Sequence, residues 1–498
     1  MTDWLLYNPQ KPLLFTRPAF WVFLLLVYAV FTLIYKKTFW RNTWLFVVSI
    51  FFYYKSSGLF FSLILLSVAV NFVIGNKLYK ADSVKKKRLW VALSVIYNLM
   101  WLVYFKYTYF FAGLLSQWFG FDIEVHDWLL TGVNQLAGSH FEASKILLPV
   151  GISFYTFQII SYIVDLYNKK VKPIKNMMDF GFYVSFFPQL VAGPIVRAAS
   201  FVPQMYSGYK VHKDEAAQAL FLILNGLIKK VVIADYISLN FVDRVFDSPL
   251  SYSGFENLLA VYGYSIQIYC DFSGYTDIAI GLALWMGFRL PLNFNSPYKA
   301  INITDFWRRW HISLSTWLKD YLYIPLGGNR KGKVRTYINL MITMLLGGLW
   351  HGANLRFVIW GALHGIYLAA HKLWLTIFPK QNSKLRVLRV IITFHLVTLT
   401  WMVFRAKSML AVKDMFLQIF YDFKGGFIIE IITGYRMVLG LILLAFTIHW
   451  LPIGWKNWYK GKFVDMPVYL KIAVTLITVF ILVQFTSAEL QPFIYFQF

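Results

Sequence analysis

Histidine side chains in one polar stretch are the residues best suited to do chemistry in this chain. The stretch runs from Asp305 to Gly365 and contains His311 and His351, each directly after a tryptophan. An imidazole gains and loses a proton near neutral pH, so either ring could act as a general base or general acid in a group transfer. We therefore take this stretch as the candidate catalytic region.

His351 has the stronger case because of its expected depth. An apolar run leads to it from Arg335, and as a helix that run would be roughly 24 Å long. His351 would then lie well inside a hydrocarbon core about 30 Å thick, where an ionisable residue suggests function. Gly347, Gly348 and Gly352 leave room for backbone or ligand to approach. We predict that His351 is a buried, neutral general base. For most of the nine histidines a structural bond to a neighbouring helix is the plainer interpretation.

Two adjacent arginines between tryptophans precede His311. Indole rings at headgroup depth and guanidinium groups near phosphate or carboxylate are typical of a membrane interface. The run could be a juxtamembrane anchor, or a site for an anionic donor such as a nucleotide-bearing thioester. The candidate substrate-binding residues are Trp307, Arg308, Arg309, Trp310, Trp350 and Asp271.

Other kinds of site find little support in the sequence. The HxxxxH and HxxHH spacings of membrane di-iron enzymes do not occur, and His364 and His371 are seven residues apart, a poor ligand pair. The single cysteine, Cys270, excludes a thiolate cluster within one chain. No G-x-S-x-G nucleophile elbow occurs. We predict no metal and no tightly bound cofactor.

The composition indicates an all-α polytopic membrane protein. Of the 498 residues 58% are hydrophobic and 14% are charged, against about 25% charged in soluble domains. Apolar runs recur along the whole chain and predict roughly eleven to fourteen membrane segments, some partial, in one domain over residues 1–498. We expect two spans joined by a turn at Asp271–Gly274. A broken or re-entrant segment lining a cavity is expected at Phe187–Pro203.

The net charge of +25 is concentrated in loops between apolar runs. Such loops are expected in the cytoplasm, and Gly327–Arg335 is one of them. The loop Gly120–Ser144 contains no Lys or Arg but four acidic residues: Asp122, Glu124, Asp127 and Glu142. We therefore expect this loop on the outer side of the membrane. No basic soluble domain remains to bind nucleic acid.

Long motifs in the chain resemble the membrane-bound O-acyltransferase (MBOAT) family. WRRWHISLSTWLKDYLYIPLGGNR and GGLWHG are similar to the bacterial branch that includes the alginate O-acetylation membrane subunit. The resemblance covers most of the chain. The other matching runs are Val150–Tyr167, Phe186–Arg197, Tyr269–Tyr298 and Pro492–Phe498.

This resemblance implies a hollow ring of helices with a thin partition and a funnel on each side. It implies an invariant histidine at His351 and a second functional histidine at His311. The acyl donor would be reached from the cytoplasm, and we expect it to be acetyl-CoA. The acetyl group would pass to an extracytoplasmic partner of the SGNH-hydrolase type that acetylates an exopolysaccharide. Such a protein would cross the bacterial inner membrane many times.

Three alternatives stay open. The sister subunit that D-alanylates teichoic acid shares the histidine motifs but is shorter and takes its acyl group from a carrier protein. A transporter of acyl groups or glycans would explain the broken segments, although no internal repeat supports it. A scaffold for a polysaccharide synthase would not need the histidines.

Overall fold

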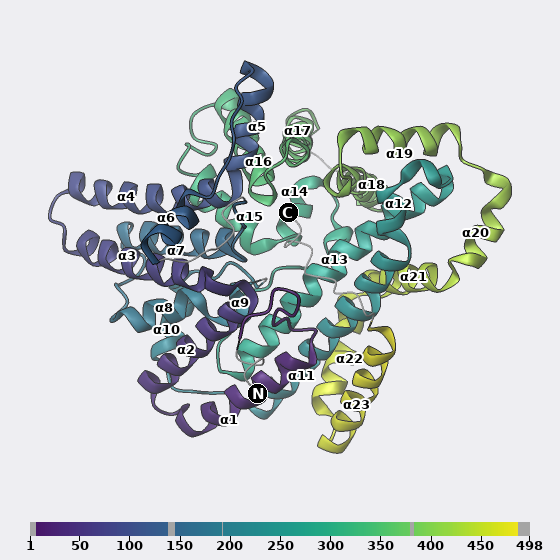
Figure 1. Cartoon of the computed structure of the whole chain (residues 1–498). Coiled ribbons are helices and arrows are strands. Elements are labelled where there is room, and N and C mark those ends of the chain that lie inside the picture. Colours follow the sequence, from purple (N-terminus) through teal and green to yellow (C-terminus); the bar gives the residue numbers. More distant parts are fainter. Residues whose placement is uncertain (1–5, 138–144, 192, 379–382, 487–498) are drawn as a thin grey trace. The chain divides into compact units, whose positions relative to one another are not determined.

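A computed structural model describes residues 6–137, 145–191, 193–378 and 383–486, and within these ranges the regular secondary structure is helical, with no strand (Figure 1). Glu142 of the predicted outside loop and the Pro492–Phe498 motif lie outside the described residues. The chain divides into two compact units. The prediction of one domain over residues 1–498 stays a prediction.

The first unit comprises Met1–Val191, Arg197–Ser207 and Gly352–Asn354. Within it a buried carboxylate, Asp179, accepts a hydrogen bond from Asn42 Nδ2 at 3.0 Å. The helices are α1 (Pro18–Ile34), α2 (Thr38–Ser57), α3 (Phe61–Lys80), α4 (Val84–Leu102), α5 (Thr108–Phe119), α6 (Trp128–Ala137), α7 (Ile152–Tyr167), α8 (Met177–Ser185), α9 (Phe187–Leu190) and α10 (Ala198–Tyr206).

The second unit comprises Ala192–Val196, Gly208–His351 and Leu355–Phe498, and it contains both candidate histidines. It begins with α11 (Lys213–Leu227), which continues into the π-helical segments η4 (Ile228–Asp235) and η5 (Ser238–Val242). The helices after these are α12 (Asp243–Asp247), α13 (Gly254–Trp285), α14 (Ile303–Arg309), α15 (Ile312–Leu318), α16 (Lys333–His351), α17 (Leu355–Ile377), α18 (Arg386–Arg405), α19 (Met409–Tyr421), α20 (Ile428–Gly434), α21 (Arg436–Trp450), α22 (Ile453–Asp465) and α23 (Val468–Phe485).

The prediction of a turn at Asp271–Gly274 is wrong, because α13 runs without interruption for 32 residues. Gly274 serves close packing and not a turn: a Cβ built there would lie 2.7 Å from the carbonyl oxygen of Gly226 on α11. Asp271 is tolerated inside the helix because it is paired with Lys230 of η4. Asp271 and Gly274 are of types that usually disfavour a helix interior, but here they make the contacts of α13 with η4 and α11.

Five helical stretches among the described residues are long and apolar enough to cross a membrane, or up to six if the pair Gly425–Gly434 and Arg436–Trp450, bent by 86°, is one span. This is fewer than the predicted eleven to fourteen segments. The difference arises because many of the predicted segments are shorter or more polar helices, such as α7 and α16. Their place in the bilayer stays a prediction.

Two local predictions about the candidate region and its surroundings are confirmed. α16 is continuous from Lys333 to His351, as the depth argument for His351 requires. The expected break near Pro188 is present, because α8 ends at Ser185 and a single helical turn, α9, follows. That this segment lines a cavity stays a prediction.

Candidate active site

His311 lies in the link between α14 and α15, in a left-handed backbone conformation with φ 42° and ψ 55°. Such a conformation is uncommon for a residue with a side chain and strains the backbone. Asn293 holds the link in place: its carbonyl oxygen accepts from the Ile312 amide at 2.9 Å, and its Oδ1 accepts from the Ser313 hydroxyl at 2.9 Å. The Ser313 hydroxyl in turn accepts from the Ile195 amide at 3.0 Å. These bonds hold the backbone that directly follows His311 in place.

His351 is the last residue of α16, and two adjacent glycines bring that helix close to its neighbours. A Cβ on Gly347 would lie 3.1 Å from Leu318 Cδ1 of α15, and one on Gly348 would lie 2.2 Å from the carbonyl oxygen of Phe357 on α17. A third glycine, Gly361 of α17, faces the Met344 carbonyl oxygen in the same way, at 2.3 Å. The glycines predicted to give room around His351 therefore allow close helix packing.

The two candidate histidines come together in the interior of the second unit. Their ring centroids are 6.4 Å apart, and the residues are 0% and 3% exposed. Two imidazoles at this separation can both act on one bound group, because each needs to approach to only about 3 Å. The structure thus brings together the two residues that the sequence singled out.

Aromatic rings enclose this pair. Phe272 of α13 packs edge-on against His311 at 4.7 Å between centroids, and Trp350 lies 5.9 Å from the same ring. Trp360 of α17 and Phe404 of α18 pack edge-on against His351 at 5.1 and 5.4 Å. An apolar enclosure of this kind strengthens polar interactions within it.

The predicted substrate-binding residues are divided between the interior and the surface. Trp310 and Trp350 are buried, Trp307 is half-buried and Arg308 is exposed. Arg309 is held by Asp305, with 2.9 Å between its Nε and the Oδ1 of the carboxylate. Arg308 is therefore the arginine of this pair that is better placed to meet a ligand from solution.

Asp271 belongs to a buried ionic cluster between η4 and α13. Lys230 contacts the carboxylates of both Asp271 and Asp235, the latter at 2.8 Å. Beside it, Lys229 contacts Asp277 at 2.7 Å. The cluster explains how charged residues are accommodated in this apolar interior. A substrate-binding role for Asp271 stays a prediction.

Sequence reasoning missed three rings that build the enclosure, Phe272, Trp360 and Phe404, and a histidine beside it, His364. His364 was considered only as a metal ligand. It is fully buried, and its ring packs edge-on against Trp360 at 4.7 Å. A signal was present, since Gly361 and Gly365 flank His364 much as glycines flank His351.

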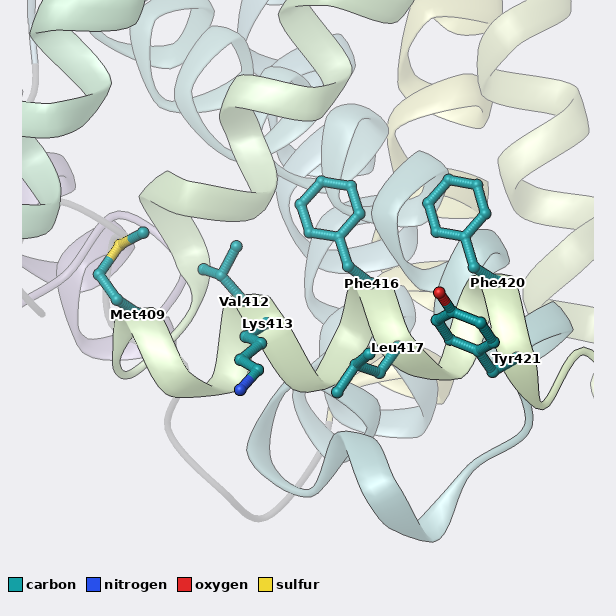
Figure 2. A pocket seen from close by; sticks show the side chains of 7 residues that line it. All are labelled: Met409, Val412, Lys413, Phe416, Leu417, Phe420 and Tyr421. Atoms are coloured by element: carbon teal, nitrogen blue, oxygen red, sulfur yellow. The ribbon is translucent and has the colours of Figure 1, made fainter.

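No group of three or more His, Cys, Asp or Glu residues within the described ranges could hold a metal ion. Figure 2 shows a pocket on α19, lined by Met409, Val412, Lys413, Phe416, Leu417, Phe420 and Tyr421. None of these is a predicted site residue. We therefore place the candidate active site at the enclosed histidines and not at this apolar groove.

Comparison with known proteins agrees with the motifs. The family model of MBOAT, the membrane-bound O-acyltransferase family, matches residues 173–412, which include His311 and His351. The peptidoglycan O-acetyltransferase of Helicobacter pylori is 39% identical over 432 residues, covering 80% of this chain and 78% of the relative. The probable alginate O-acetylase AlgI of Pseudomonas aeruginosa is 39% identical over 438 residues, covering 85% and 80%.

A more distant relative has another acyl group in its name. The teichoic acid D-alanyltransferase of Bacillus subtilis is 29% identical over 289 residues, covering 54% of this chain and 71% of the relative. The similarity to both kinds of enzyme, the family model across the histidine region and the apolar helices lead to one conclusion. The chain belongs to the membrane-bound O-acyltransferase family and is a polytopic membrane enzyme that transfers acyl groups to oxygen.

Proposed function

We propose that this enzyme takes acetyl groups from acetyl-CoA at the cytoplasmic face and passes them across the membrane for O-acetylation of an extracytoplasmic polysaccharide. The observation that carries the proposal is the enclosed pair His311 and His351, at 6.4 Å between centroids. Such a pair offers a base and a second proton-handling group away from bulk water, which would otherwise hydrolyse the thioester.

In the proposed reaction, His351 accepts the proton of the acceptor hydroxyl while the oxygen attacks the thioester carbonyl carbon. A neighbouring N–H group stabilises the tetrahedral oxyanion. The carbon–sulfur bond then breaks, and the CoA thiolate takes up the proton held by His351. His311 positions a reacting group or relays a proton. The products are the acetyl ester and free CoA, so no other reactant is required.

Charge supports entry of the donor from the cytoplasmic side. Arg330 and Lys331 lie in the loop before α16, and Lys333 and Arg335 lie in the first turn of that helix; basic segments of this kind are retained in the cytoplasm. Arg308, which is exposed on α14, is a further candidate contact for the phosphates of CoA. The bacterial inner membrane is accordingly the proposed location.

The names of the relatives support a polysaccharide as the final acceptor. Those at 39% identity are named for O-acetylation of peptidoglycan and alginate and align over most of the chain, whereas the D-alanyltransferase aligns over 54% of it. The acetyl group is proposed to reach the glycan through an SGNH-type partner outside the membrane.

The proposal is tested with purified enzyme in lipid vesicles and acetyl-CoA labelled on the acetyl group. Vesicle-enclosed glycan or a surrogate alcohol acts as the acceptor. We expect free CoA on the donor side and labelled ester on the other. Label that crosses without release of CoA would instead identify a transporter, and the proposed reaction would be wrong.

A further inference from the structure

The hydrogen bonds of His364 define which of its ring nitrogens is available. His364 is fully buried on α17, and its Nε2 lies 3.0 Å from the hydroxyl oxygen of Thr400. That hydroxyl has one hydrogen, and its shorter contact, at 2.7 Å, is to the Val397 carbonyl oxygen. With the hydrogen assigned to the carbonyl, Nε2 donates to Thr400 and Nδ1 carries the lone pair.

Three polar atoms around this ring have no hydrogen-bond partner among the residues that the structure describes. They are the acceptor nitrogen Nδ1 of His364 and the indole N–H donors of Trp307 and Trp360. The two indoles pack against the imidazole at 5.1 and 4.7 Å between centroids. Buried polar atoms are nearly always bonded to protein or to ordered water, so three in one aromatic cluster favour a small polar group beside them.

An alcohol hydroxyl matches this set of atoms. Its hydrogen can be donated to Nδ1 of His364, and its oxygen can accept from an indole N–H. A carbonyl oxygen would leave the lone pair of Nδ1 unmatched. A carboxylate or phosphate would bring its negative charge against the lone pair of Nδ1, and the cluster has no positive charge to offset this repulsion. The chemistry of the cluster therefore favours a neutral O–H group.

The cluster is continuous with the candidate active site. Trp360 packs edge-on against both His364 and His351, at 4.7 and 5.1 Å between centroids. A hydroxyl held at His364 would thus be separated from the proposed base by one indole ring. We propose that His364, with Trp307 and Trp360, is the subsite that binds a hydroxyl of the acyl acceptor. This inference rests on the proposed function.

The test compares two substitutions that each keep one nitrogen position of the ring. In His364→Asn the amide oxygen lies about where Nδ1 was, so the acceptor for the bound hydroxyl is kept and the bond to Thr400 is lost. In His364→Gln the longer amide reaches about where Nε2 was, so the bond to Thr400 is kept and the other acceptor is lost.

The readout is the ratio of acetylated saccharide to free acetate formed from labelled acetyl-CoA with a short oligosaccharide as surrogate acceptor, because its hydroxyls are far enough apart to reach His364 and His351 together. This ratio is internal to each sample, so neither expression nor the folded fraction changes it. Loss of one buried hydrogen bond to the alcohol corresponds to about a tenfold fall in the ratio. We expect that fall in His364→Gln, and a ratio within about threefold of wild type in His364→Asn.

Three results would overturn the subsite. The ratio could be the same in all three proteins, it could fall more in His364→Asn than in His364→Gln, or ester and acetate could fall together, as for a bound water or a packing role. Thr400→Val removes the bond that sets the tautomer of His364, so we expect a smaller fall in the ratio than in His364→Gln. A wild-type enzyme that releases no CoA would refute the proposed function and the subsite with it. Active enzyme with an unchanged ratio would refute the subsite alone.

Discussion

His311 combines a strained backbone with a buried side chain, so its two roles can be separated by substitution. Both His311→Gly and His311→Ala remove the imidazole, but only alanine must hold a Cβ at φ 42°. We expect both variants to lose acyl transfer, and the alanine variant to be less stable than the glycine variant by about 1 kcal/mol. Thermal unfolding in detergent measures the difference. Equal stability of the two variants would show that the left-handed backbone at this position costs no folding free energy.

Lys456 of α22 offers a pH-dependent contribution to stability. Burial, and then the nearby Lys299 and Lys229, lower its pKa to about 8. Its ordinary value is near 10.5, so between about pH 8 and pH 10.5 the unfolded chain holds more protons. Stability contributed by this residue therefore rises with pH across that window and is lost as pH falls through about 8.

We expect this rise to be absent from Lys456→Met, so the wild type should gain stability relative to that variant from pH 8 to 10.5. Unfolding midpoints measured in a series of buffers give the difference. The exposed Lys462→Met is the control for loss of a surface charge. A constant difference between wild type and Lys456→Met over the window would contradict the assigned cause.

At the scale of helices, close contact between α16 and α17 sets the position of His351. A Cβ on Gly348 would lie 2.2 Å from the Phe357 carbonyl oxygen, which cannot move without its helix. We expect Gly348→Ala to separate the helices, to destabilise the protein by about 1–3 kcal/mol and to lower acyl transfer.

Gly440→Ala on α21 is the matched control, because nothing lies within 4 Å of its Cβ position. Alanine in an open helical position stabilises by about 0.5–1 kcal/mol. Activity assays and unfolding midpoints of both variants decide the matter. A fully active, stable Gly348→Ala protein would mean that α16 is not positioned by this contact.

Helices were predicted correctly from the sequence where apolar runs were long. The prediction failed where contacts with other helices stabilise residues that disfavour a helix on their own. The continuous α16 follows from its apolar run. Asp271 and Gly274 suggested a turn because, taken alone, an aspartate and a glycine disfavour a helix. In α13 the aspartate is paired with Lys230 and the glycine faces a neighbouring backbone. Both partners are distant in sequence, so no local pattern could reveal them.

The candidate site was predictable to a similar extent. His311 and His351 were identified from their motifs, and the structure brings them together. The left-handed backbone at His311 was not predictable, because no glycine or turn motif occurs there. The role that we propose for His364 depends on its bond to Thr400 and on two indoles. Contacts of this kind arise only when separate helices pack.

At the scale of the whole molecule, the account requires that the basic loop before α16 faces the cytoplasm. The only native cysteine, Cys270, is buried, so one introduced cysteine can report the topology. We expect Lys331→Cys to react with a membrane-impermeant maleimide only after the cells are permeabilised. Reaction in intact spheroplasts would place this loop outside and reverse the proposed direction of acyl transfer.

The central claim is that His351 is the base of an acyl transfer within the membrane. The most direct test is the rate at which purified wild type and His351→Ala form labelled ester from acetyl-CoA, with the exposed His395→Ala as control. We predict a fall of about 10²–10⁴-fold for His351→Ala, with unchanged insertion and unfolding midpoint, and a wild-type rate for the control. A folded His351→Ala enzyme that works at the wild-type rate would contradict the account.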